Sequence, residues 1–125
     1  MPEHYSGAAV RHFHDAEALA ANQRFDNAAH LVGFAAECAV KHAIEALRPA
    51  NEAPHLHLPE LVEKAKRLMR GRARHPLFTV LFLPTFMSGW KVGDRYSASG
   101  TITQQMYESW RADASRALGA AQLRG

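Results

Sequence analysis

The sequence predicts an all-α protein, an antiparallel up-and-down bundle of four to five helices in a single domain that spans residues 1–125. Apolar residues recur at spacings of three and four in several segments, which is the pattern of helices that bury one face. Alanine is abundant, whereas the chain has only eight glycines and six prolines, a composition that suits helices better than a β-sandwich. A length of 125 residues leaves room for one hydrophobic core.

The first two helices are expected in the N-terminal part of the chain. The first covers about residues 7–23, with Ser6 as its N-cap. Its apolar stripe consists of Val10, Phe13, Ala16 and Ala20. After a short break, Asp26 or Asn27 is expected to cap a second helix that continues to about residue 47. A proline two residues later prevents further extension, because proline lacks a backbone N–H and clashes with the preceding turn.

A third helix is expected to begin at residues 58–60, with Pro59 in the first turn, where a missing N–H costs little. Gly71 is its expected C-terminal signal. The apolar segment 76–86 has few β-branched residues, so we expect a buried helix that bends near Pro84.

The last helix follows a loop at residues 89–100. Thr101 or Thr103 is expected to cap it, and it continues to about residue 118. Its buried face consists of Ile102, Met106, Trp110, Ala114 and Ala117.

Composition excludes several classes of protein. Lysine and arginine total 15 against 12 aspartates and glutamates, a net charge of +3 that does not by itself establish a nucleic-acid binder. Cys38 is the only cysteine, which excludes an internal disulfide and a multi-cysteine zinc site, and the histidines lack matched ligands at metal spacing. No apolar run reaches the roughly 18 residues of a membrane span. We therefore expect a cytoplasmic protein with no membrane, no metal and no cofactor.

The second helix carries the most informative pattern. It is apolar over most of its circumference, and its polar exceptions are His30, Glu37, Lys41, His42, Glu45 and Arg48. A sector of roughly 120°, the polar sector, contains His30, Gly33, Glu37, Lys41, Glu45 and Arg48. Glu37 and Lys41 have the favourable i,i+4 order, so they either form a helix-stabilising pair or line a shared polar cleft. Cys38 is expected to be an inert core residue, and the large apolar surface of the helix predicts a homodimer.

Three segments resemble the HEPN family of small helical proteins. The run from Phe25 to Glu45, FDNAAHLVGFAAECAVKHAIE, is similar to the second HEPN helix, in which small residues precede a glutamate and a lysine. His57-Leu-Pro-Glu-Leu resembles the H-x-L-x-x-L segment at the start of the third helix of that family. Trp90-Lys-Val-Gly-Asp-Arg-Tyr96 resembles a W…RY element ahead of the last helix.

The resemblance implies a helical bundle that often forms a homodimer and acts as a ribonuclease in toxin–antitoxin or phage-defence systems. Other HEPN domains pair with a small nucleotidyltransferase or serve as binding modules. The ribonuclease branch has an arginine followed four to six residues later by a histidine, and Arg95 occupies that place here without a following histidine. We therefore expect a non-catalytic domain that binds nucleotide, RNA phosphate or a partner protein. An active ribonuclease toxin and a purely structural dimeric module are the alternatives.

The expected ligand site combines Arg95 and Tyr96 with Lys41 and Glu37. Small residues after Tyr96 lead into a helix start, where free backbone N–H groups attract anions. Arg95 and Lys41 would hold phosphate, Tyr96 would stack on a base, and Glu37 would orient a cation. The alternative is that residues 90–101 form only a capping loop.

Residues 64–75 form the densest basic segment. Its cations are Lys64, Lys66, Arg67, Arg70, Arg72 and Arg74, followed by His75. Such a run can neutralise phosphates without reading sequence, or it can be an ordinary solvated face.

Overall fold

The structure is a computed structural model that describes residues 4–47, 55–96 and 99–123, without the side chains of residues 95 and 96. The described chain contains helices and no strand, which confirms the all-α bundle. The elements are α1 (Tyr5–Ala21), α2 (Phe25–Leu47), α3 (Glu60–Leu68), α4 (Pro76–Leu81), the 3₁₀ helix η1 (Val92–Tyr96) and α5 (Gln104–Ala120). None of the described helices is long and apolar enough to cross a membrane.

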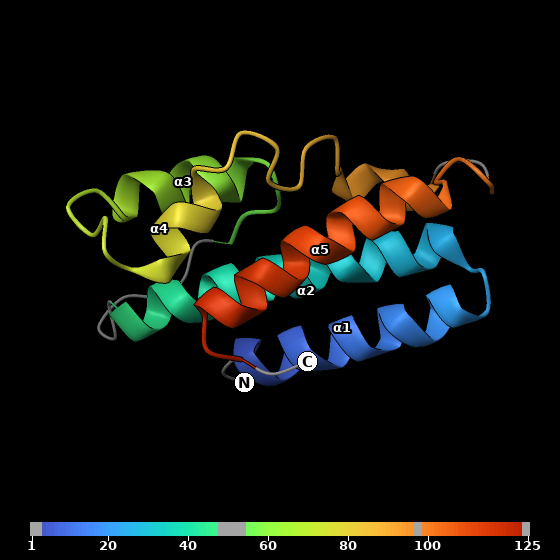
Figure 1. The fold of residues 1–125 in the computed structure, drawn as a ribbon, viewed down its shortest axis with the longest axis horizontal. Coiled ribbons are helices and arrows are strands. Elements are labelled where there is room, and N and C mark those ends of the chain that lie inside the picture. Colours follow the sequence, from blue (N-terminus) through green and yellow to red (C-terminus); the bar gives the residue numbers. More distant parts are fainter. Residues whose placement is uncertain (1–3, 48–54, 97–98, 124–125) are drawn as a thin grey trace.

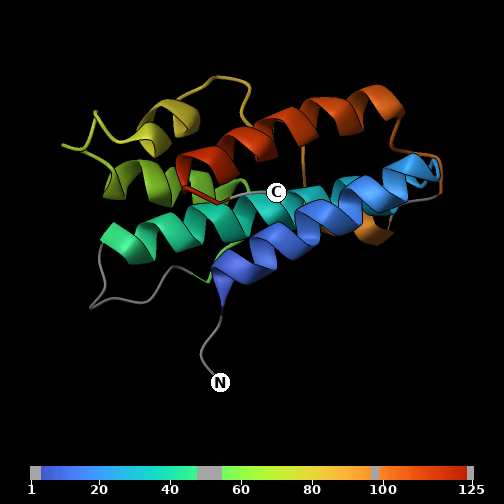
Figure 2. The same ribbon diagram turned by 60° about the horizontal axis from the view of Figure 1, so that its bottom comes forward.

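Helix α2 lies at the centre of the bundle and contacts α1, α3, α5 and η1 (Figure 1). Helix α1 runs antiparallel to α2 along one side, and α3 and α4 lie beside the C-terminal half of α2 on the opposite side (Figures 1 and 2). Helix α5 runs in the same direction as α2, so the bundle is not up-and-down throughout. The reason is the long connection over residues 82–103, which returns the chain to the N-terminal end of α2 before α5 begins.

Several expected helix ends differ from the structure. Helix α1 begins at Tyr5, so Ser6 lies inside its first turn, and no side chain caps it. Asp26 also lies inside its helix, α2, rather than at the N-cap. Its carboxylate instead accepts hydrogen bonds from the backbone N–H groups of Gly100 (2.8 Å) and Ile102 (3.0 Å). Thr103 is the N-cap of α5, as one of the two expected alternatives, and its hydroxyl accepts from the backbone N–H of residue 106 at 3.1 Å.

The apolar segment after residue 76 forms a shorter helix than expected, because α4 ends at Leu81 and turns follow. The turns contain two left-handed residues, Met87 (φ 51°) and Gly89 (φ 82°). Helix α5 holds them in place: Asp113 accepts the backbone N–H of Met87 at 2.9 Å, and the indole of Trp110 donates to the carbonyl of residue 88 at 2.8 Å. Turn bonds within the segment satisfy several of its backbone N–H groups, and side chains of α5 satisfy the N–H of Met87 and the carbonyl of Ser88.

Helix α2 is covered within the single chain. Its buried residues are Ala28, Ala29, Val32, Gly33, Ala35, Ala36, Glu37, Ala39, Val40, Ala43 and Ile44. The sequence argument for a homodimer relied on an apolar surface that a small bundle leaves uncovered, and the neighbouring elements cover that surface here. Dimerisation itself stays a prediction.

Candidate functional site

The polar sector of α2 is covered at Gly33. The side chain of Trp90 packs there and is 3% exposed, and its indole N–H donates to the carbonyl of Ala29 at 2.8 Å. A β-carbon at position 33 would overlap Cε2, Cζ2 and Nε1 of this ring. The ring of His30 stacks at 6.0 Å from the indole centroid. The missing side chain of Gly33 therefore leaves the space that the indole of Trp90 occupies. This part of the polar sector packs against the segment that leads into η1 and is not open to a ligand.

The same sector is covered again at Glu37, which is 3% exposed. Its carboxylate accepts the backbone N–H of Leu58 at 2.8 Å, and Nδ1 of His57 lies 3.1 and 3.2 Å from its two oxygens. When Glu37 is ionised its carboxylate can only accept, and the proton of this contact then lies on Nδ1 of His57. The second ring nitrogen, Nε2, then carries the lone pair when the ring is neutral. The described partners of Glu37 are thus His57 and Leu58, and not Lys41 as the helix spacing suggested.

Lys41 lies in a cavity of about 470 Å³ between α1, α2 and the segment before α3. We call it the basic pocket. Its described lining consists of His4, Tyr5, Ala8, Arg11, Cys38, Lys41, His55 and His57. The ammonium of Lys41 lies 5.4 Å from the ring centroid of Tyr5, a cation–π contact that holds the lysine near the pocket wall. Cys38 is half-buried in this lining rather than a core residue.

The chemistry of the basic pocket favours an anion. One guanidinium, one ammonium and three imidazoles contribute to its described lining, which includes no carboxylate. Glu37 lies beside it and is engaged by His57, whose side chain is 53% exposed. Arginine and lysine bind phosphate by charge-assisted hydrogen bonds, and imidazole both donates hydrogen bonds and moves protons near neutral pH. The described residues contain no cluster of three or more His, Cys, Asp or Glu side chains that could hold a metal ion.

The structure places the four expected site residues in two positions along α2. Lys41 lines the basic pocket, and Glu37 lies beside it, bound to His57 of the pocket lining. Arg95 and Tyr96 belong to η1, which contacts α2, and the chain on either side of η1 is attached at Ala29 and Asp26, near the start of α2. No residue of η1 is among the described lining of the basic pocket. The roles expected for Arg95 and Tyr96 stay predictions, because the structure does not describe their side chains.

Sequence reasoning missed most of the basic pocket. His57 was visible only as part of the His57-Leu-Pro-Glu-Leu segment, and no motif pointed to Arg11. The pocket combines residues separated by up to about fifty positions, and helical periodicity carries no signal for such pairings. A glutamate among the alanines of the second helix was a further indication, since buried carboxylates need specific partners.

Comparison of the chain with protein-family models, with curated proteins and with solved structures gave no match in any of the three cases.

Proposed function

We propose that this chain is a HEPN-like domain that binds a phosphate-bearing ligand, a nucleotide or a stretch of RNA, in the basic pocket. The observation that carries the proposal is the convergence of Arg11, Lys41 and three histidines on one cavity. These residues come from three separate parts of the chain, so no local helix pairing accounts for their meeting. The cavity volume of about 470 Å³ lies within the range of small-molecule sites.

Binding of AMP and of inorganic phosphate tests this proposal. Lys41→Met and Arg11→Met should each weaken binding about tenfold or more, because a charge-assisted hydrogen bond contributes about 1.5–3 kcal/mol. Lys64→Met is the matched control, since Lys64 is an exposed lysine of α3 outside the pocket lining. Wild-type protein that binds neither ligand contradicts the proposal. If Arg95→Ala weakens binding while Lys41→Met does not, the ligand binds at η1 instead.

A second function, cleavage of RNA, is favoured by the contact between Glu37 and His57. In such a reaction Nε2 of His57 accepts the proton of a ribose 2′-hydroxyl, and O2′ attacks phosphorus. The bond from phosphorus to O5′ breaks, and O5′ takes a proton from a second, protonated imidazole of the pocket. The products are a 2′,3′-cyclic phosphate and a free 5′-hydroxyl. The absence of a histidine after Arg95 argued against cleavage, whereas His57 supplies an imidazole from elsewhere in the chain.

A dinucleotide cleavage assay separates the two functions. Loss of a general base costs about 10²–10⁴-fold in rate, so His57→Gln should abolish measurable cleavage. Glu37→Gln keeps an acceptor for the Leu58 N–H but removes the negative charge, and it should slow cleavage while AMP still binds. His14→Gln, which changes an exposed histidine of α1, is the control. Nucleotide binding without cleavage by the wild type supports a binding module alone.

The partners implied by the HEPN resemblance are proposals of the same kind. A homodimer would sediment at about twice the mass of the 13.8 kDa chain at micromolar concentration. A nucleotidyltransferase partner, as in a toxin–antitoxin pair, would co-purify with the chain when both are expressed together.

A further inference from the structure

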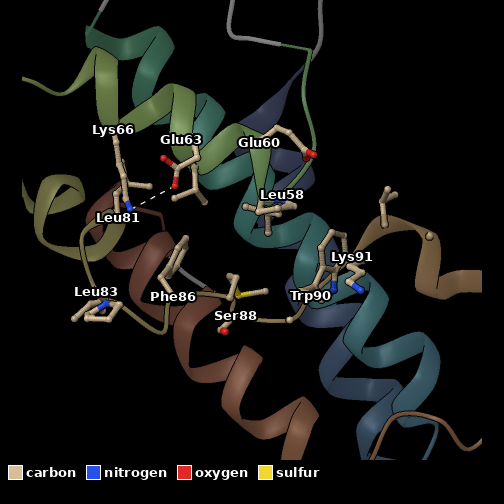
Figure 3. Close-up of a pocket in the computed structure, with 17 residues that line it drawn as sticks. Leu58, Glu60, Glu63, Lys66, Leu81, Leu83, Phe86, Ser88, Trp90 and Lys91 are labelled. Atoms are coloured by element: carbon tan, nitrogen blue, oxygen red, sulfur yellow. Dashed lines mark ion pairs between the residues drawn. The ribbon is translucent and has the colours of Figure 1, made fainter.

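A second and larger cavity lies on the other side of the segment that carries His57. It is a groove of about 680 Å³ between α3 and residues 83–93 (Figure 3). His57 lines the basic pocket and the next residue, Leu58, lines the groove, so the two cavities are neighbours with different linings. The floor of the groove consists of buried apolar side chains: Leu58, Val62, Leu81, Phe86, Met87 and Trp90.

The rim of the groove has four charged side chains, and two of them form a pair. The ammonium of Lys66 lies 3.6 Å from the carboxylate of Glu63, and it also lies over the ring of Phe82 at 5.2 Å. Glu60 and Lys91 are exposed, and no described residue forms an ion pair or hydrogen bond with either. Figure 3 shows both at the end of the groove where Trp90 lies, with Leu81 and Leu83 toward the other end.

The wall opposite α3 is held by hydrogen bonds to a backbone carbonyl of α2 and to two side chains of α5. The indole N–H of Trp90 donates to the carbonyl of Ala29 in α2, and the backbone N–H of Met87 donates to the carboxylate of Asp113 in α5. The indole N–H of Trp110 in α5 donates to the carbonyl of Ser88. These bonds fix the turns that form the wall, so the groove exists before any ligand arrives, as is usual for small-molecule sites.

We propose that the groove binds a short apolar peptide of two or three residues with free termini. Its side chains would cover the apolar floor, its ammonium would pair with Glu60, and its carboxylate would pair with Lys91. Charge complementarity supports this occupant, because the two unpaired rim charges have opposite signs at one end of an apolar groove. A polyanion is disfavoured, since the four rim charges sum to zero. The inference is independent of the phosphate ligand proposed for the basic pocket.

Calorimetric titration with the dipeptide Leu-Phe in four forms tests the assignment: free, N-acetylated, C-amidated and blocked at both ends. The wild type should bind the free form most tightly, with about a two- to fivefold loss on blocking either terminus, because ion pairs to exposed side chains contribute little. Glu60→Gln should bind the free and acetylated forms equally, and Lys91→Met should bind the free and amidated forms equally. Both residues are exposed, so the two variants should unfold at the wild-type temperature.

Lys64→Met is the control for a change of net charge at an exposed site outside the groove. It should leave all four affinities unchanged. The proposal is wrong if the free dipeptide does not bind the wild type. It is also wrong if either rim variant weakens the free and blocked forms by the same factor. Binding of the fully blocked dipeptide as tightly as the free one would show that the floor binds apolar compounds without recognising their termini.

Discussion

Gly33→Ala is the most direct test of how η1 and its preceding segment are attached to α2. The added methyl group would overlap the indole of Trp90, whose N–H is bonded to the carbonyl of Ala29. A rigid ring held at one end cannot move aside without losing that bond. We therefore expect the substitution to displace the indole of Trp90 from its buried position against α2. The contact between α2 and residues 90–96 should weaken as a result.

The magnitude follows from two opposing contributions. Loss of a buried tryptophan costs about 3–5 kcal/mol, and the displaced ring loses this burial and its hydrogen bond. Alanine is the better helix former, which returns up to about 1 kcal/mol. The expected net loss is about 2–4 kcal/mol in the free energy of unfolding. At about 4 °C per kcal/mol for a chain of this size, the melting temperature should fall by about 8–16 °C.

Urea denaturation, monitored by circular dichroism, measures this change. Gly7→Ala and Gly119→Ala are matched controls, because both glycines lie in helices and a β-carbon there meets no atom within 4 Å. Each control should leave stability unchanged or raise it slightly. In a Trp90→Ala background, Gly33→Ala should become stabilising, since the clash is gone. A single Gly33→Ala variant as stable as the wild type would refute the reasoning.

Three further predictions concern polar contacts. Replacing Glu37 with leucine should lower the free energy of unfolding, measured by urea denaturation, by about 1–3 kcal/mol, because the backbone N–H of Leu58 loses its buried acceptor. An unchanged free energy of unfolding would contradict this. Asp26→Ala should speed hydrogen exchange at the two backbone N–H groups that it binds ahead of α5, and unaltered exchange would show that water replaces the carboxylate without cost. Burial, aided by the charge of Arg11, lowers the pKa of His12, so the unfolded chain takes up a proton at a higher pH than the folded chain does. The unfolding free energy should therefore decrease as the pH falls through the ordinary histidine value of about 6.5, and His12→Phe should make that decrease smaller between pH 7.5 and 5.5.

The contact between α1 and α5 shows what helical patterning leaves out. Each helix was predictable from its apolar stripe, yet the pairing of Arg111 with Glu17 at 2.9 Å joins residues far apart in the sequence. This bond raises the pKa of Arg111, since the carboxylate stabilises the charged guanidinium. It forms because α5 runs antiparallel to α1 and parallel to α2, which follows from the path of residues 82–103.

The sequence by itself determined the class of fold, the approximate extent of four helices and the importance of the polar sector on α2. Apolar periodicity, caps and prolines act between residues near each other in the chain, so they can be read without the tertiary structure. Only the tertiary structure decided what covers that sector. Trp90 fills the space at Gly33, and His57 with the Leu58 N–H satisfies Glu37, because a buried carboxylate must find hydrogen-bond donors wherever the folded chain provides them. Those donors come from loops, whose paths no helical period specifies.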